Sequence, residues 1–248
     1  MIKPFLLIQS RPEDDAAYDE YKSIMQIGYL AKSDLISHRI EQKSLRQLPD
    51  LGNFSGIIIG GGPSNISDAY NQKSIEQQKY EPLLYELVNN VVARDFPFLG
   101  ICYGMGLLAS HFKESIVSKK VSEPVGGVNI KLTNHGKTDP LLKNVPNEFS
   151  GFAGHKEGVE VLPEHVNILA YSSECRVQMI KVKNNVYATQ FHPELNHDGL
   201  AKRIDIYKNH GYFEPQESEK LKSKSKQFVV EHPYLILENF IKNYSVIS

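Results

Sequence analysis

Three short apolar runs, each followed by a segment with helical spacing, limit the folds open to this chain more than any other feature. The runs lie at residues 5–9, 56–59 and 97–100, and the segments with helical spacing that follow them lie at 14–29, 79–92 and 103–111. Such an alternation of buried strands and helices predicts an α/β fold, with a mostly parallel central sheet and helices on both faces.

The middle of the chain changes character. Short β-branched runs separated by polar turns occupy 125–133 and 167–190, which predicts an antiparallel β region at one side of the sheet. After Glu194 the helical spacing returns, with apolar faces at 200–207 and 235–241. We expect a single domain over 1–248, with a core at about 1–195, a C-terminal helical extension at about 196–248 and a polar, loop-like stretch at 211–226.

The composition argues against several classes of protein. Lys and Arg number 28 and Asp and Glu 29, so the net charge of −1 gives no reason to expect nucleic acid as a partner. The apolar stretches are too short for a membrane span or a signal peptide. Cys102 and Cys175 form neither a disulfide framework nor a metal-ligand spacing. We expect a cytoplasmic protein with no metal or cofactor and no contact with membranes.

The stretch GICYG at 100–104 places Cys102 between two glycines, directly after an apolar run. A nucleophile on a strained strand-to-helix turn needs small residues two positions before and after it, so that the backbone can pass close by. The N-terminus of the following helix would then favour a thiolate. The alternative is a buried cysteine that serves as a small hydrophobe. This stretch alone does not decide between the two interpretations.

The stretch QFHPE supplies His192 and Glu194 at the end of a β-type run. Residues two apart on an extended chain point to the same side, so the carboxylate can reach the imidazole and fix its tautomer. A thiol nucleophile needs such a base, and the base needs such an orienting group. Alone, His-Pro-Glu would be more typical of a surface turn.

The stretch GGGPS at 60–64 follows the second apolar run. Attack on a carbonyl creates an oxyanion that backbone N–H groups can stabilise, and a glycine-rich loop can present one of them. No Gly-Lys-Ser/Thr follows, so the loop is not a phosphate-binding P-loop, and it does not match the dinucleotide fingerprint.

In this order, and at separations of about 40 and 90 residues, the three stretches resemble a class I glutamine amidotransferase domain. The resemblance is closest to the glutaminase domain of GMP synthetase, here free-standing. It implies a flavodoxin-like fold and a catalytic triad of Cys102, His192 and Glu194. Cys102 would attack the side-chain amide of glutamine, release ammonia and leave a γ-glutamyl thioester, while His192 moves the protons and Glu194 orients His192.

The resemblance also suggests which residues hold the substrate. Gly62 and Tyr103 would supply the oxyanion N–H groups, with Gly61 as the second choice in the loop. The segment 154–158 resembles the loop that holds the amino-acid end of glutamine. We therefore predict that the substrate contacts Gly61, Gly62, Gly106, His155 and Glu157. The alternative for His155 is a structural histidine held by hydrogen bonds.

Two departures from the family pattern leave the substrate open. The family often has Gln four residues after the nucleophile and Gly after the loop histidine, where this chain has Gly106 and Lys156. A γ-glutamyl peptide hydrolase with the same triad is therefore one alternative function, and a catalytically silent binding domain is another. The sequence shows no ATP-pyrophosphatase half, so we expect any ammonia acceptor to be a separate synthetase subunit. Homo-oligomer formation is left open.

Overall fold

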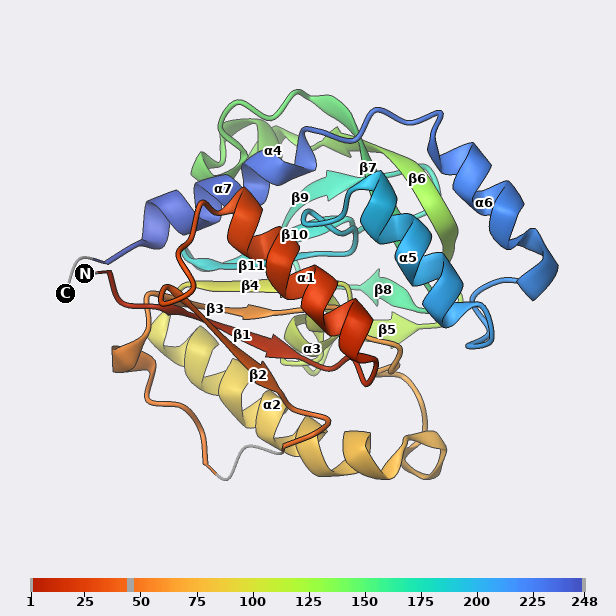
Figure 1. Cartoon of the computed structure of the whole chain (residues 1–248). Helices are drawn as coiled ribbons and strands as arrows, with labels where there is room; N and C mark the ends of the chain where they lie inside the picture. The colour runs from red at the N-terminus through yellow and green to blue at the C-terminus, as the bar shows by residue number, and fades with distance from the viewer. Residues whose placement is uncertain (1, 44–46, 247–248) are drawn as a thin grey trace.

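The central element of the computed structural model, which describes residues 2–43 and 47–246, is a sheet with strand order β2-β1-β3-β4-β11-β10-β9-β6-β7 (Figure 1). The first five strands in this order are parallel to one another: β2 (Leu35–Arg39), β1 (Phe5–Gln9), β3 (Gly56–Ile59), β4 (Phe98–Ile101) and β11 (Val186–Thr189). The sequence prediction of a mostly parallel α/β sheet is confirmed in this half.

The other strands form an antiparallel region at one side of the sheet. They are β10 (Met179–Val182), β9 (Asn167–Tyr171), β6 (Glu123–Leu132) and β7 (Glu148–His155). A separate ribbon pairs β5 (Ile116–Ser118) with β8 (Gly158–Val161). β11 was expected among the antiparallel strands, but it is antiparallel only to β10 and parallel to β4, so it joins the two halves.

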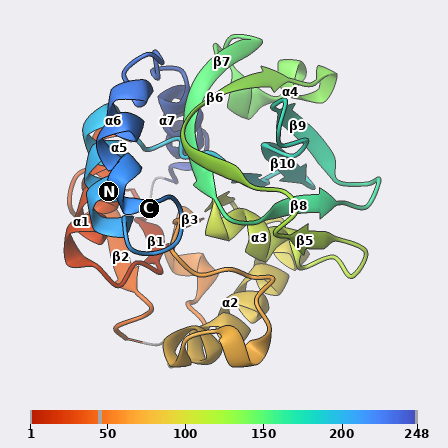
Figure 2. The ribbon, with the colours of Figure 1, turned by 90° about the vertical axis from the view of Figure 1, so that its right-hand side faces the viewer.

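Helices cover both faces of the sheet. The longer ones are α1 (Asp14–Ile27), α2 (Ile75–Arg94), α3 (Tyr103–Ala109), α5 (His197–Tyr207), α6 (Ser218–Ser225) and α7 (Pro233–Tyr244). Short helical turns are α4 (Asn134–Thr138), η1 (Leu51–Asn53), η2 (Tyr70–Gln72), η3 (Pro140–Leu142) and η4 (Pro215–Glu217). Figure 2 shows α1, α5 and α7 on one side of the sheet and α2 and α3 on the other.

Strand β1 shows how one strand serves two cores, because successive side chains point to opposite faces. Phe5 and Leu7 pack with α7, and the rings of Phe5 and Phe240 lie 6.0 Å apart between centroids. Leu6 and Ile8 pack on the other face with α2. Since α7 lies beyond residue 195, the C-terminal segment contributes to the core of the domain.

Two elements differ from the sequence expectations for physical reasons. β2 was not predicted because it is an edge strand, in which Leu35 is buried but Ile36 and Ser37 are exposed. The stretch 211–226 is not all loop, since it contains α6, whose buried residues are Ser218 and Ser225. A helix that buries small polar side chains has no apolar stripe by which to recognise it.

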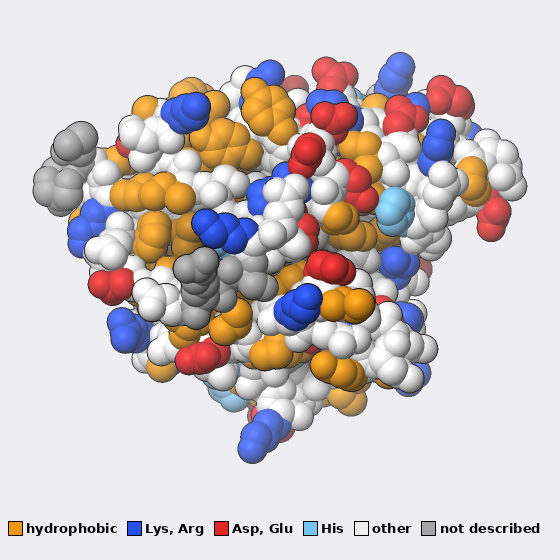
Figure 3. Space-filling model, turned by 60° about the horizontal axis from the view of Figure 1, so that its bottom comes forward, with side chains coloured by type: hydrophobic (Ala, Val, Ile, Leu, Met, Phe, Trp, Pro, Cys, Tyr) orange, Lys and Arg blue, Asp and Glu red, His pale blue; other side chains and the backbone are white. Residues whose placement is uncertain are grey.

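The surface of the described residues is mixed in character. On the face shown in Figure 3, Lys and Arg side chains are interspersed with Asp and Glu, with apolar side chains between them. Among the described residues, no helix has the length and apolar character that crossing a membrane requires.

The turn from β4 into α3 depends on glycine at two positions. A Cβ on Gly100 would lie 2.6 Å from the carbonyl oxygen of Gly104, and a Cβ on Gly104 would lie 2.8 Å from the carbonyl oxygen of Ile59. Both obstacles are backbone atoms held by strand or helix pairing. Only glycine therefore fits at both positions without a shift of the sheet.

We expect Gly104→Ala to lower the free energy of unfolding by about 1–3 kcal/mol, because the methyl group must displace the end of β3. Urea denaturation measures this change. The matched control is Gly52→Ala in the exposed turn η1, where the new Cβ would meet only the side chain of Asp50, at 3.3 Å. The control should change stability by less than about 0.5 kcal/mol. Equal losses in both variants would contradict the close approach at Gly104.

Candidate active site

The residues singled out by the sequence meet at the carboxyl ends of the parallel strands, which is where open α/β sheets bind ligands. Arg11 follows β1, Gly61 follows β3, Cys102 follows β4 and His192 follows β11. A Cβ placed on Gly61 would lie 2.7 Å from His192 Cε1, 2.7 Å from Arg11 Nη2 and 3.5 Å from Cys102 Cβ. The three predicted motifs therefore converge on one point, and Arg11 joins them there.

Cys102 occupies the turn between β4 and α3 in a strained conformation. Its φ is 53° and its ψ is −92°, a combination that side-chain-bearing residues rarely adopt. Its backbone N–H donates to the carbonyl of Thr189, at 2.7 Å, which fixes the turn against β11. This is the geometry expected of a nucleophile elbow.

His192 is held by its neighbours on both sides. Its Nδ1 lies 2.9 Å from Glu194 Oε1, and its backbone N–H donates to the carbonyl of Phe152 at 2.8 Å. Since Glu194 accepts from Nδ1, the free ring nitrogen is Nε2. No hydrogen bond joins His192 to the Cys102 sulfur among the described residues; the sulfur lies 3.9 Å from Gln190 Nε2.

Arg203 of α5 completes this arrangement, which the sequence did not predict. Its Nη1 donates to Glu194 Oε1 at 2.9 Å and lies 3.4 Å from His192 Nδ1. Burial alone would raise the pKa of Glu194, but His192 and the Arg203 guanidinium together hold that pKa well below its usual range. Glu194 is therefore an anion.

Burial shifts the pKa values of the imidazole and the thiol in the directions that favour their neutral forms. Burial is the main reason why the pKa of His192 is lowered, and Glu194 offsets this only in part. Burial raises the pKa of Cys102 to about 12, and Arg11 lowers it by less than burial raises it. This direction runs against the sequence expectation of a thiolate, which stays a prediction.

Backbone N–H groups at the predicted oxyanion positions are available as donors. Tyr103 is the first residue of α3, where an N–H has no partner within the helix. Within the described residues, the N–H groups of Gly61 and Gly62 donate no hydrogen bond to protein. Their geometry is compatible with the predicted role.

The predicted substrate-side residues lie together, but they already have partners. Both ring nitrogens of His155 are bonded, Nε2 to Glu123 Oε2 and Nδ1 to the carbonyl of Glu157, each at 2.8 Å. This agrees with the alternative of a structural histidine. The carboxylate of Glu157 accepts from the N–H groups of Ile66 and Ser67 at 2.6 and 2.9 Å.

The position of Gly106 is closed by these same residues. A Cβ there would lie 3.0 Å from Ile66 Cγ1 and 3.8 Å from Glu157 Oε1. Ile66 and the Glu157 carboxylate therefore occupy the space into which a longer side chain at this position would grow. Substrate contact by Gly106, His155 and Glu157 stays a prediction.

One group of side chains has the composition of a metal site. Ligand atoms of Glu123, His155 and Cys175 lie within 4.8 Å of one another. However, Ser172 donates to one oxygen of Glu123 at 2.7 Å and Gln178 donates to the other at 2.6 Å. With His155 bonded at both nitrogens, these side chains form a hydrogen-bonded cluster that joins the start of β6 to the end of β7.

Cys102 borders two pockets of different character. We call the first the polar pocket; it is lined by Gly62, Ser64, Asn65, Cys102, Tyr103, Gly106, Val117, His155, Lys156, Glu157, Gly158, Gln190 and Tyr212. We call the second the apolar chamber; it is lined by Arg11, Gly62, Cys102, Val125, Ala153, Gly154, His192, Leu195, Leu200, Arg203, Ile204, Tyr207, Tyr212 and Phe213. Of the predicted substrate contacts, Gly62, Gly106, His155 and Glu157 line the polar pocket, and Gly61 lines neither pocket.

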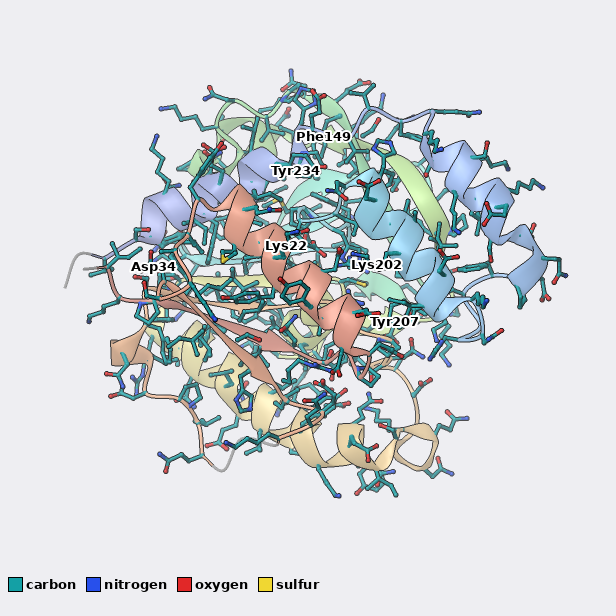
Figure 4. The ribbon with its side chains drawn as sticks, in the orientation of Figure 1. Lys22, Asp34, Phe149, Lys202, Tyr207 and Tyr234 are labelled. Atoms are coloured by element: carbon teal, nitrogen blue, oxygen red, sulfur yellow. The ribbon has the colours of Figure 1, made fainter. Side chains whose placement is uncertain are left out.

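The segment after α5 covers the site. Tyr207, labelled in Figure 4, lies where the end of α5 meets the start of α1, and its hydroxyl accepts from Arg11 Nη1 at 3.1 Å. The hydroxyl of Tyr212 donates to the carbonyl of Gly62 at 3.4 Å, and Lys156 Nζ lies 4.5 Å from the Tyr212 ring centroid. Arg11, which contacts Tyr207, is itself held by a buried ion pair: its Nε lies 2.9 Å from Glu20 Oε1.

A strained cysteine elbow beside a His–Glu pair, on a mostly parallel α/β sheet, is the arrangement that the predicted class of amidotransferase requires. The model of the family described as "Glutamine amidotransferase class-I" matches residues 17–209. The chain therefore belongs to the class I glutamine amidotransferase family, whose members are enzymes that act on the side-chain amide of glutamine.

Particular relatives refine this assignment. The chain is 32% identical over 177 residues to one subunit of the glutamine-hydrolyzing GMP synthase of Methanococcus vannielii, covering 71% of this chain and 80% of that protein. It is 28% identical over 183 residues to a glutamine-hydrolyzing GMP synthase of Borrelia garinii subsp. bavariensis, covering 74% of this chain and 30% of that protein. A solved glutamine amidotransferase of Thermotoga maritima has the same fold, with a TM-score of 0.74 at 17% identity and 98% of both chains covered.

Arg203 should set the acid limit of activity. With neutral His192 as the predicted base, activity should fall as pH drops through the pKa of His192, which lies below the ordinary value of 6.5. Arg203→Met removes a positive charge that lowers this pKa, so we expect the acid limb of kcat/KM for glutamine to move to higher pH. Arg203→Lys retains the charge and should keep the limb near its wild-type position. An unmoved limb in the Met variant, with only a lower kcat, would mean that Arg203 merely supports the fold.

Proposed function

We propose that this chain is the glutaminase component of a glutamine amidotransferase, with Cys102, His192 and Glu194 as its catalytic triad. The observation that carries the proposal is the strained backbone of Cys102, which lies beside a His192 already oriented by a buried carboxylate. Strain of this kind persists only where the surrounding structure enforces it, and it concentrates at active sites.

The first half of the reaction acylates the enzyme. Nε2 of His192 takes the thiol proton while the sulfur attacks the amide carbon of glutamine. The resulting oxyanion accepts from the N–H groups of Tyr103 and Gly62, with Gly61 as the second choice for the loop donor. The imidazolium, stabilised by anionic Glu194, then protonates the nitrogen. The C–N bond breaks, ammonia leaves, and the γ-glutamyl group stays on sulfur as a thioester.

The second half returns the enzyme to its resting state. His192, neutral again, takes a proton from water as the water oxygen attacks the thioester carbon. Collapse of this intermediate breaks the C–S bond, reprotonates the thiol and releases glutamate. A neutral resting pair suits this cycle, because the thiol gives up its proton only when a carbonyl carbon is present to receive the sulfur.

Ammonia would pass to a separate synthetase subunit. The relative from Methanococcus vannielii is named as one subunit of a GMP synthase, which supports an acceptor on another chain. Both cysteines are free thiols, which supports a reducing, cytoplasmic location. Whether copies of this chain associate with one another stays a prediction.

Replacement of triad members tests the assignment. Cys102→Ala should lower glutamine hydrolysis by at least about 10³-fold, and His192→Ala by nearly as much. Glu194→Gln should cost less than either, because the amide oxygen can still accept from His192 Nδ1 while the negative charge that balances the imidazolium is lost. The double variant of Cys102 and His192 should be hardly worse than either single variant, since the residues act as a unit. Glutamate release measures all four.

The matched control is Cys175→Ala, which removes the other thiol from a fully buried position outside both pockets. It should keep wild-type activity. A second readout is independent of turnover: a diazoketone analogue of glutamine should alkylate Cys102 but not Cys175, as seen by peptide mass spectrometry. Full activity in Cys102→Ala, or labelling of Cys175 alone, would overturn the assignment.

A further inference from the structure

In this structure the site is too small for glutamine. The polar pocket has a volume of about 20 Å³ and the apolar chamber one of about 50 Å³. A single water molecule needs about 10–15 Å³ by the same measure, so the polar pocket has room for roughly one or two waters. The amino-acid end of glutamine, with its carboxylate, its ammonium group and its methylene chain, is several times larger. Some part of the wall must therefore move before glutamine reaches Cys102.

Tyr212 is the side chain that divides the site. It borders both the polar pocket and the apolar chamber, as do Gly62 and Cys102, so it lies between the two cavities beside the nucleophile. Burial raises the pKa of its hydroxyl, and a negative charge on Cys102 would raise that pKa further. If Tyr212 moved out, the two cavities would join into one space that reaches both sides of Cys102. We call residues 208–214, which carry Tyr212, the cover segment.

Long contacts hold the cover segment in place. The Tyr212 hydroxyl lies 3.4 Å from the carbonyl oxygen of Gly62. Lys156 Nζ lies 3.3 Å from the carbonyl oxygen of His210. Nε2 of the His210 side chain, which is 41% exposed, lies 3.4 Å from Glu13 Oε1. Each distance exceeds the usual range for a hydrogen bond of its type. Weak contacts of this kind open at a small cost in free energy.

The other walls of the polar pocket are held more tightly. Cys102 donates its backbone N–H to Thr189 at 2.7 Å, and Glu157 accepts from the N–H of Ile66 at 2.6 Å. The cover segment, in contrast, contains a glycine in the left-handed region: Gly211 has a φ of 72°, and nothing lies within 4 Å of the place where its Cβ would be. A segment with weak contacts and one such glycine can change its path without disturbing the sheet. The cover segment is therefore the wall that moves.

We propose that the cover segment is a gate, which admits glutamine to Cys102 only when Tyr212 has moved out of the site, and that Lys156 is its latch. Lys156 contacts the segment twice, at the His210 carbonyl and at the Tyr212 ring, whose centroid lies 4.5 Å from Nζ. Glycine, which the family often has at this position, could make neither contact. Without substrate the closed gate keeps other reagents away from the thiol. The inference rests on the proposed function for the identity of the substrate, but not for the closure itself.

The first test measures the access of a small neutral reagent to Cys102 in the full chain and needs no turnover. Gly211→Ala strains the closed conformation alone, because alanine tolerates a positive φ poorly and the added methyl group meets no other atom. We expect iodoacetamide to alkylate Cys102 at least about fivefold faster in this variant than in the wild type, as seen by peptide mass spectrometry. Gly52→Ala, in the exposed turn η1 and without a positive φ, is the matched control and should leave the rate unchanged.

The second test removes the latch. Lys156→Met keeps the volume of the side chain but loses the ammonium group that contacts His210 and Tyr212, so alkylation of Cys102 should be at least about threefold faster. The matched control is Lys208→Met at the exposed start of the same segment, because the Lys208 side chain makes no hydrogen bond or ion pair within the described residues. Cys175 is fully buried and should react equally slowly in every variant, which shows that each one is folded.

The third test connects the gate to glutamine. A site that is open for only a fraction of the time binds its ligand with an apparent Kd raised by the inverse of that fraction. Gly211→Ala increases the open fraction, so KM for glutamine should fall at least about threefold while kcat stays within about twofold of the wild-type value. Glutamate release measures both constants.

The failures are distinguishable. Equal alkylation rates in the variants and their controls would overturn the gate and leave the proposed function intact. Faster alkylation without a lower KM would also overturn it, because glutamine would then reach Cys102 by another route. A faster rate in Gly211→Ala but not in Lys156→Met would overturn the role of Lys156 as the latch. If alkylation follows the gate but neither the wild type nor any variant hydrolyses glutamine, the closure stands and the proposed function itself fails.

Discussion

The parallel pairing of β4 with β11 is the constraint on which the rest of the site depends. In this register Ile101 lies opposite Thr189, so the residues that follow the two strands emerge side by side. The 2.7 Å bond from the Cys102 N–H to the Thr189 carbonyl continues the pairing by one residue past the end of β4. This hydrogen bond holds Cys102 in its positive-φ conformation. His192, three residues after Thr189, lies at the same edge of the sheet. Since Gly104 lets the turn pass close to the end of β3, Cys102 and His192 are positioned by the ends of the sheet's own strands.

Buried charges then connect this edge to the helices around it. Two arginines, Arg11 and Arg203, lie beside the site, and each has one buried carboxylate partner, Glu20 and Glu194 respectively. Breaking such a pair leaves an uncompensated charge away from water, which is costly. α1, which carries Glu20, and α5, which carries Arg203, are therefore tied to the site as well as packed against the sheet. Asn196 fixes the start of α5 by accepting from the N–H of Gly199 at 2.7 Å, two residues after Glu194. The relative positions of the Glu194 carboxylate and of the Arg203 guanidinium are thus fixed by the short turn that begins α5.

Much of this could be predicted from the sequence, and the remainder could not for identifiable reasons. The strands at 5–9 and 56–59 were predicted because both of their faces are buried, so they are continuous apolar runs. Cys102 and His192 were recognisable because glycine and β-type residues around them are local signals. Arg203 was not, since an arginine on a helix is usually solvated, and only the fold brings it to Glu194 across nine residues. The effect of burial on the pKa of Cys102 could not be predicted for the same reason: the helix N-terminus is visible in the sequence, whereas the burial arises from chain segments far away.

The two departures from the family pattern acquire a common meaning in the structure. Gly106 and Lys156 both border the polar pocket, where Ile66 and Glu157 close the space beside Gly106 and Lys156 stacks on Tyr212. Tyr212 in turn bonds Gly62 and forms part of the wall of both pockets. The segment after α5 is therefore held by Lys156 on one side and, through the Tyr212 hydroxyl, by the glycine-rich loop after β3 on the other. Leu200, Ile204 and Phe213 of α5 and this segment line the apolar chamber beside Cys102. The two departures from the family pattern thus lie where this segment meets the polar pocket, and Lys156 is one of the residues that hold the segment there.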